Sequence, residues 1–182
     1  MSRVGKLLIA NPNFPEESPF AKSVIYVYQD DARAGTIGLV LNKPTLTITD
    51  FCEENGIMFP DTVPMMHTGG PVNPTALVLL HTDDWESSNT ASVGNGLRIS
   101  SDNHMLLKIS TGNEPIYWRA FYGMSAWRVG QLDKELAGEF PYVKNTWLTA
   151  DATDDIIFNY DSEEQWIMAV DLCSQQTINH FF

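Results

Sequence analysis

The sequence has few basic residues. Its 182 residues include 11 Lys and Arg against 23 Asp and Glu, so the formal net charge is −12 at pH 7. Lys and Arg supply much of a protein's affinity for nucleic-acid phosphates, and they also draw proteins to anionic lipid surfaces. A balance this acidic argues against direct nucleic-acid binding and against a membrane partner.

Cysteine and long apolar runs are also scarce. Cys52 and Cys173 lie far apart in the chain, with neither a CxxC pair nor metal-type His spacing around them. Disulfide-stabilised secreted domains carry more Cys in a shorter chain. The first apolar run, Leu7–Ala10, is shorter than the about 7–15 residues of a signal peptide or the about 20 of a membrane helix. We therefore expect buried free thiols and a cytoplasmic protein.

Sequence signatures of catalysis are missing too. The patterns GxSxG, HExxH, GxGxxG and GxxxxGK[ST] do not occur. The four histidines are scattered, and no two lie three or four residues apart, the spacing that would present both to a metal from one helix face. We therefore expect no metal and no cofactor, and these absences favour a protein that binds over one that catalyses.

The chain does contain enough apolar residues, 43%, for one domain spanning residues 1–182. Short β-branched and aromatic runs predict strands, and amphipathic stretches predict helices. The expected strands are Leu7–Ala10, Ser23–Tyr28, Thr36–Asn42, Met65–Thr68, Ala76–His81, Thr90–Val93, Leu97–Ser100, Ile116–Tyr122 (ended by Gly123) and Trp147–Ala150. The expected helices are a short one ending at Glu54, one from Ser101 to near Gly112, Trp127–Ala137, Asp151–Phe158, and Glu163–Cys173 with Trp166, Ile167, Val170 and Cys173 facing inward.

Strands and helices are interspersed, and several strands are close enough in sequence to pair as hairpins. The Asn95-Gly96 dipeptide between two short runs is one such signal, because both residues tolerate positive φ. The pattern predicts an α+β fold with a strongly bent mixed sheet, largely antiparallel, and flanking helices.

Three segments are distinctive in combination: Gly35–Pro44 (GTIGLVLNKP), Gly69–Val72 (GGPV) followed by an apolar strand ending at His81, and Gly123–Leu136 (GMSAWRVGQLDKEL). With an LLIANP start and a TWLTADATDDIIF stretch, the chain resembles the AlgH/YqgE family of bacterial proteins of uncharacterised activity from Gly5 to about Leu172. The resemblance implies a bifurcated sheet folded into a pseudo-barrel with helices around it. One branch of the family is named a transcriptional regulator, and the resemblance implies no catalytic residue, cofactor or ligand.

Two candidate features surround the GGPV segment. Gly69 and Gly70 allow positive φ and close backbone approach, and Pro71 fixes the exit direction. The turn is either a requirement of the topology or an anion-binding concavity of free N–H groups. His81 is either a neutral, hydrogen-bonded core histidine or a general base, and Asn42 is a third polar residue of the same distinctive segments.

A third candidate lies in the Gly123–Leu136 segment. Trp127, Gln131 and Glu135 recur every four residues, which on a helix would place an aromatic ring, an amide and a carboxylate along one edge. In that helix Gly130 would be an interior residue. The edge is either purely structural or the lining of a groove.

These features favour a non-enzymatic binding or regulatory module whose partner is a protein or a small molecule. A direct transcription factor is disfavoured, because no helix-turn-helix with a basic recognition helix is present. The alternative is an enzyme of unrecognised type with its site near the Gly69–Val72 turn, His81 and Asn42. The two hypotheses differ in whether those residues meet in one concave pocket.

Overall fold

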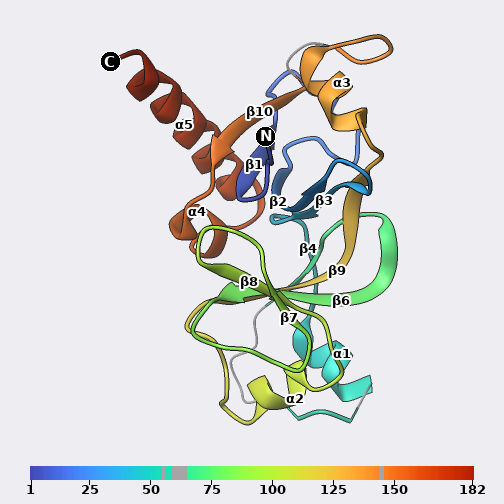
Figure 1. The fold of residues 1–182 in the computed structure, drawn as a ribbon. Helices are drawn as coiled ribbons and strands as arrows, with labels where there is room; N and C mark the ends of the chain where they lie inside the picture. Colours follow the sequence, from blue (N-terminus) through green and yellow to red (C-terminus); the bar gives the residue numbers. More distant parts are fainter. Residues whose placement is uncertain (55, 59–64, 144–145) are drawn as a thin grey trace.

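One curled sheet runs through the molecule. The computed structural model describes residues 1–54, 56–58, 65–143 and 146–182, and ten strands in these ranges form the sheet (Figure 1). The strands are β1 (Lys6–Ala10), β2 (Val24–Asp31), β3 (Gly35–Val40), β4 (Pro44–Thr47), β5 (Met65–Thr68), β6 (Val72–Thr82), β7 (Thr90–Ser92), β8 (Leu97–Ser100), β9 (Trp118–Trp127) and β10 (Trp147–Asp151). The main path is β10-β1-β2-β3-β9-β6-β8-β7, with β5 joining β4 to β9.

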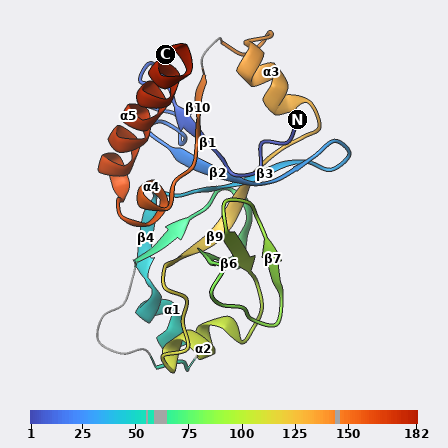
Figure 2. The same ribbon diagram turned by 60° about the vertical axis from the view of Figure 1, so that its left-hand side comes forward.

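The sheet forks at β9. The C-terminal part of β9, Ser125–Trp127, pairs antiparallel with β3. Its N-terminal part pairs antiparallel with β6 on one edge and, at Phe121 and Tyr122, parallel with β5 on the other. Figure 2 shows the two resulting halves, with β1, β2, β3 and β10 above and β6, β7 and β8 below. The predicted bent, bifurcated and mixed sheet, largely antiparallel, is therefore confirmed.

Five helices in the described ranges pack around this sheet. They are α1 (Ile48–Glu54), α2 (Met105–Ser110), α3 (Gln131–Ala137), α4 (Asp154–Phe158) and α5 (Ser162–Phe181). Helices α1 and α2 lie at one end of the molecule, and α3 lies at the other (Figure 1). Within the described ranges, no helix has both the length and the apolar character needed to cross a membrane.

The core has three apolar clusters, because the sheet presents faces to different helices. The largest lies beside α4 and α5 and includes Tyr26 and Phe121. A second lies beside α1 and α2 and contains the thiol of Cys52, whereas Cys173 on α5 is half-buried. The third packs Trp127 and Trp147 against β1, β2 and α3.

The region from Gly123 to Gly130 differs from the sequence prediction. Gly123 does not end the strand: although its φ is +68°, β9 continues to Trp127. The helix predicted over Trp127–Ala137 begins only at Gln131, because Gly130 adopts a left-handed conformation (φ 75°) immediately before it. Trp127 is thus a strand residue, and Gly130 is not inside a helix.

Helix boundaries elsewhere are shifted. The helix expected from Ser101 begins at Met105, and the one expected from Asp151 begins at Asp154, where the Thr153 hydroxyl caps it by accepting from the Ile156 N–H. Helix α5 runs on to Phe181. Its inward residues were also partly mispredicted, since Ile167 is 53% exposed, whereas the buried positions are Gln165 and Ala169.

Helix α5 covers the outer edge of β10. The side chain of Gln176 accepts from the Asp151 N–H (2.7 Å) and donates to the Asp151 carbonyl (3.0 Å). The Cys173 thiol donates to the Thr149 carbonyl (3.3 Å). Two helix side chains therefore replace three of the hydrogen bonds that a further strand would make.

Candidate functional site

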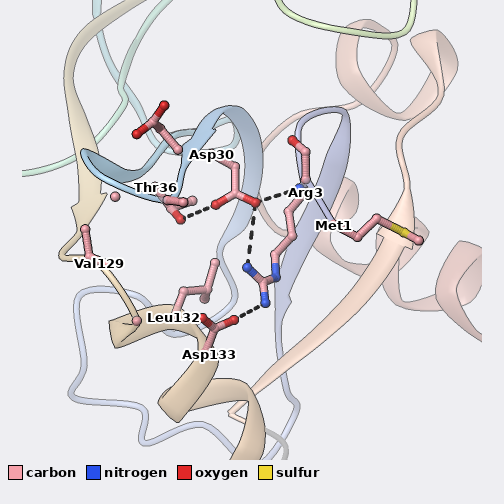
Figure 3. A pocket seen from close by; sticks show the side chains of 12 residues that line it. Met1, Arg3, Asp30, Thr36, Val129, Leu132 and Asp133 are labelled. Carbon is pink, nitrogen blue, oxygen red and sulfur yellow. Dashed lines mark hydrogen bonds and ion pairs between the residues drawn. The ribbon is translucent and has the colours of Figure 1, made fainter.

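A concavity of about 390 Å³ opens where three distant segments meet (Figure 3). One wall is the N-terminal segment, the second is the β2–β3 hairpin, and the third is the turn from β9 into α3. Its lining residues include Met1, Arg3, Asp30, Asp31, Thr36, Val129, Gly130, Leu132 and Asp133. The antiparallel pairing of β3 with β9 brings the hairpin and the turn together.

Arg3 and Asp30 organise the wall of this concavity. The Arg3 backbone N–H donates to Asp30 Oδ2 (2.7 Å), and its guanidinium lies 3.7 Å from the same oxygen. The Thr36 hydroxyl donates to Asp30 Oδ1 (2.7 Å). The Arg3 guanidinium also forms an ion pair with Asp133, whose side chain is 61% exposed. Asp30 is therefore fixed by two hydrogen bonds and one ion pair, while Asp133 faces solvent.

A third carboxylate adds negative charge at the rim. The backbone N–H groups of Arg33 and Ala34 donate to Asp31 (2.7 and 2.8 Å), and they hold the pKa of its exposed carboxyl below the usual range. Three aspartates thus line the concavity against one arginine. The balance of charge suits a cationic group.

A second concavity of about 540 Å³ adjoins the first across Val129 and Gly130, which line both. Its other lining residues are Arg128, Gln131, Lys134 and Tyr142. The side chains of Arg128 and Lys134 are exposed, and in the described part of the chain neither makes an ion pair. In a chain with net charge −12, two free cations at one concavity favour an anionic group there.

The GGPV turn lies inside the fork of the sheet, away from both concavities. Gly69 donates its N–H to the Tyr122 carbonyl (2.7 Å), and its carbonyl accepts from the Val40 N–H (2.9 Å) and the Ser125 hydroxyl (3.2 Å). These bonds insert the turn between β3 and β9. Gly70 has a positive φ of 148°, as the sequence predicts for at least one of the two glycines, and Pro71 follows at the exposed start of β6.

The backbone of β9 passes very close to this turn. A Cβ on Gly69 would lie 2.4 Å from the Gly123 carbonyl oxygen, and a Cβ on Gly70 would lie 2.3 Å from the Met124 carbonyl group. Conversely, a Cβ on Gly123 would lie 2.4 Å from the Gly70 oxygen. The fork of the sheet therefore requires glycine on both crossing segments.

His81 is fully buried and hydrogen-bonded through both ring nitrogens. Its Nδ1 lies 2.8 Å from the Thr82 carbonyl and its Nε2 lies 2.8 Å from the Ser100 hydroxyl. Because a carbonyl can only accept, Nδ1 carries the proton and neutral His81 accepts from Ser100 through Nε2. The ring also meets Trp85 edge-on at 5.0 Å. Burial lowers the pKa of His81 below its ordinary 6.5.

This depressed pKa predicts a loss of stability in weak acid. The unfolded chain takes up a proton at His81 near pH 6.5, whereas the folded chain resists it, so stability is complete above that pH and falls as the pH drops towards the folded pKa. We expect the urea midpoint of the wild type to fall between about pH 7 and about pH 5.5. In His81→Gln the fall over this window should be smaller, and an equal fall in both proteins would contradict the assignment.

Asn42 joins three segments through its side-chain amide. Its Oδ1 accepts from the Val24 N–H (3.0 Å), and its Nδ2 donates to the carbonyls of Lys22 (2.8 Å) and Ser162 (2.9 Å). The segment that carries Asn42 runs beside the GGPV turn, because the Val40 N–H donates to the Gly69 carbonyl and the Lys43 carbonyl accepts from the Thr68 N–H (2.8 Å). His81 lies apart from both, near the opposite end of β6. None of them lines either of the two concavities.

The predicted trio of Trp127, Gln131 and Glu135 does come together. The Glu135 carboxylate is buried and accepts from Trp127 Nε1 (3.1 Å), from Gln131 Nε2 (3.0 Å) and from Trp147 Nε1 (2.9 Å). The predicted helical edge does not explain the contact, because Trp127 is not on α3 and reaches Glu135 from the end of β9. Gln131 alone of the three lines a concavity, the second one.

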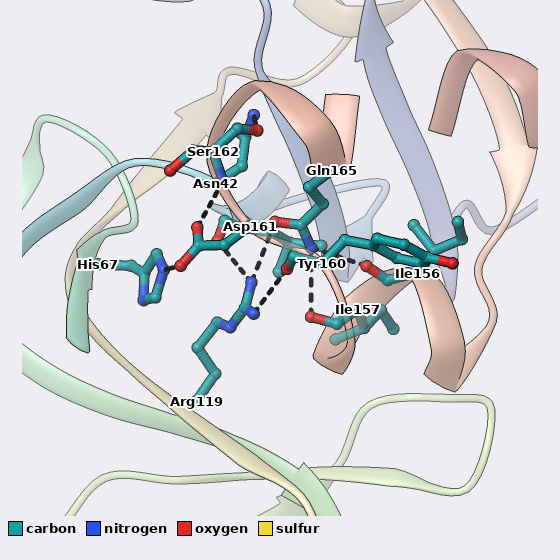
Figure 4. Close-up of polar contacts among 10 residues, drawn as sticks. Asn42, His67, Arg119, Ile156, Ile157, Tyr160, Asp161, Ser162 and Gln165 are labelled. Carbon is teal, nitrogen blue, oxygen red and sulfur yellow. Dashed lines mark hydrogen bonds and ion pairs between the residues drawn. The ribbon is translucent and has the colours of Figure 1, made fainter. Parts of the chain in front are cut away.

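A buried polar network was missed by sequence reasoning (Figure 4). Arg119 on β9 donates to the carbonyls of Leu41 (3.0 Å) and Tyr160 (2.8 Å) and to Gln165 Oε1 (3.0 Å). Burial lowers the pKa of Arg119, and the charge of Asp161 opposes this effect. The sequence does contain one indication that Arg119 is buried. It stands two residues before the apolar Phe121, so on a strand the two side chains lie on the same face, and Phe121 is buried.

His67 on β5 belongs to the same region. Its Nε2 lies 2.9 Å from Asp161 Oδ2, while its buried Nδ1 has no hydrogen-bond partner among the described residues. Burial alone would raise the pKa of Asp161, but the hydrogen bond from His67 and the Ser162 N–H lower it overall. Asp161 also caps α5, and the sequence Asp161-Ser162-Glu163-Glu164 has the spacing typical of such a cap.

Known proteins resemble this chain over most of its length. A family model described as AlgH-like matches residues 7–177. A UPF0301 protein of Shewanella frigidimarina is 31% identical over 168 residues, which cover 89% of this chain and 86% of the relative. A UPF0301 protein of Rhizobium etli strain CIAT 652 is 32% identical over 176 residues, which cover 91% of this chain and 84% of the relative.

Two solved structures share the fold. The solution structure of the AlgH protein from Pseudomonas aeruginosa has a TM-score of 0.73 at 28% identity and covers 92% of this chain and 87% of that one. A crystal structure of a Corynebacterium diphtheriae protein has a TM-score of 0.66 at 20% identity, covering 91% and 84%. On these matches, the chain belongs to the AlgH-like family of bacterial proteins.

Proposed function

We propose that the protein is a non-enzymatic, cytoplasmic binding module that acts in regulation through a partner protein. The ligand is a charged segment of that partner, lying across the ridge formed by Val129 and Gly130. Its cationic group faces Asp133 and Asp31, and its anionic group faces Arg128 and Lys134. The observation that carries the proposal is the adjacency of two concavities with opposite charge.

The chemistry of the two linings supports binding over catalysis. The described residues that line them supply carboxylates, cations, an amide and hydroxyls, and these residues include neither His nor Cys. Charged groups arranged in two zones select a ligand by charge and orientation. Val129, which is 57% exposed on the ridge between them, offers an apolar contact at the centre.

A titration with short peptides tests this proposal. The probe is the acetylated, amidated pentapeptide Lys-Gly-Leu-Gly-Glu, added to ¹⁵N-labelled protein while amide shifts are followed. We expect saturable shifts at Val129 and Gly130. The substitutions Asp133→Asn and Lys134→Gln should each weaken binding by about threefold to tenfold, since each removes one charge contact at an exposed site.

The controls separate a specific site from general charge effects. Lys108→Gln, on α2 at the opposite end of the molecule, should leave the affinity unchanged (Figure 1). The neutral peptide Gln-Gly-Leu-Gly-Gln should not bind, and duplex DNA should not bind at about 150 mM salt because the chain carries net charge −12. Shifts that do not saturate, or an equal loss in the Lys108 variant, would refute the proposal.

The enzyme hypothesis retains one supporting observation. His67 contacts Asp161 through Nε2, and its Nδ1 has no partner among the described residues, which is the arrangement of a histidine base oriented by a carboxylate. His67 lies two residues before Gly69, close in sequence to the turn that the enzyme hypothesis favours. The test is to screen the wild type against a broad panel of hydrolase substrates. A hydrolase activity that is found there and lost in a still-folded His67→Gln variant would support this second function.

A further inference from the structure

The outer side of α5 carries a stripe of exposed residues with a regular spacing. Ile167, Ile178 and Phe181 are 53%, 56% and 78% exposed, which is unusual for large apolar side chains on one helix. We call this surface the outer stripe of α5, and it consists of Glu164, Ile167, Asp171, Ser174, Ile178 and Phe181. Successive residues of the stripe are alternately three and four positions apart in the sequence. A 3-4 alternation is the spacing with which one helix packs along another.

The inner side of the same helix is already occupied. Gln165 and Ala169 are buried against the body, and Gln176 hydrogen-bonds to β10. From Thr177 onward every residue of α5 is exposed, and the helix projects beyond the sheet (Figure 1). The outer stripe is therefore a surface separate from the packing that holds α5 in place.

The charge around the stripe identifies the kind of partner. Residues 146–182 contain seven Asp and Glu and no Lys or Arg, and Glu164 and Asp171 lie within the stripe itself. A second copy of this chain would bring a molecule of net charge −12 against another of the same charge. A basic partner gains from the same field, so charge complementarity selects it over self-association.

We propose that the outer stripe of α5 binds an amphipathic, basic α-helix of a partner protein. Apolar residues of the partner pack on Ile167, Ile178 and Phe181, and flanking Lys or Arg residues face Glu164 and Asp171. The surface does not include the two concavities, so it stands whether or not they bind a peptide. It would make the protein a bridge between two partner segments.

Fluorescence anisotropy with a designed peptide tests the surface. The probe is a fluorescein-labelled 18-residue peptide of Leu and Lys with Leu at 3-4 spacing, titrated with the full chain. The double variant Ile178→Ser with Phe181→Ser is expected to raise the Kd at least tenfold. The double variant Glu164→Gln with Asp171→Asn should raise it severalfold at low salt and flatten its salt dependence.

Matched variants test whether the peptide binds nonspecifically to any exposed apolar or acidic residue. Ile116→Ser and Asp83→Asn change an exposed apolar residue and an exposed acid in loops away from α5, and they should leave the Kd unchanged. A peptide of Leu and Glu with the same spacing should not bind. Equal losses in the matched variants would overturn the proposal. So would a wild-type dimer in sedimentation that Phe181→Ser dissociates, since the stripe would then be a self-association surface.

Discussion

Replacing Gly70 with alanine is expected to destabilise the protein by about 2–5 kcal/mol, a large part of the about 5–15 kcal/mol of a typical domain. Two causes act together at this position. The positive φ of 148° is strained for any residue with a Cβ, and the new Cβ would lie 2.3 Å from the backbone of Met124. Because the obstacle is main chain inside the fork of the sheet, no side-chain rotation relieves it.

Two further glycines separate these causes. Gly112 has φ +86° but no atom within 4 Å of an added Cβ, so Gly112→Ala carries the conformational cost alone, about 1–2 kcal/mol. Gly69 is not at positive φ, but its Cβ would meet the Gly123 oxygen at 2.4 Å, so Gly69→Ala carries the steric cost, about 1–3 kcal/mol. Urea unfolding followed by circular dichroism measures all three. A Gly70 variant as stable as the Gly112 variant would contradict the close approach at the fork.

Replacing Arg119 with methionine should cost about 3–5 kcal/mol, because methionine fills the space and leaves the acceptors of the guanidinium without a donor. Those acceptors belong to Leu41, Tyr160 and Gln165, so a single side chain ties β9 to the end of β3 and to the start of α5. Arg119→Lys should recover only part of the loss, since an ammonium cannot reproduce the planar fork of donors.

The matched control for this substitution is Arg98→Met on β8, which is separated from β9 by β6. Arg98 is partly exposed and its guanidinium lies 3.4 Å from the exposed carboxylate of Glu86, so its replacement should cost less than about 1 kcal/mol. Hydrogen exchange of the α5 amides provides a second measurement, and we expect faster exchange in Arg119→Met at the start of the helix. Equal stabilities of the Arg119 and Arg98 variants would show that the buried network does not hold α5.

Local patterns were sufficient to predict most of the strands. The β2–β3 hairpin follows from two β-branched runs joined by a short polar turn, and the β7–β8 hairpin from Asn95-Gly96, both of which have positive φ as predicted. Gly123 misled the prediction because a glycine in a strand is normally a break. Here it is required by Gly70 on another segment, and a contact between residues so distant in sequence leaves no local signal.

The residues of the candidate site were much harder to predict. Arg3, Asp30 and Asp133 are single charged residues of ordinary segments, and they form one wall only after β3 pairs with β9. The contact between His67 and Asp161 likewise joins residues 94 positions apart. Periodicity reports which face of an element is apolar, but it carries no information about which polar residues of different elements will meet.

The cover that Gln176 provides for β10 hinders strand addition from another molecule at this edge. An open strand edge is a template on which another chain can add a strand. Of the two ends of the main strand path, one is β10, whose Asp151 backbone groups are already satisfied by a helix side chain. The other is β7, which is only three residues long and offers little to pair with. Both ends of this open strand path therefore offer few free backbone groups to another chain, and the side of α5 that covers β10 is not the side that carries the outer stripe.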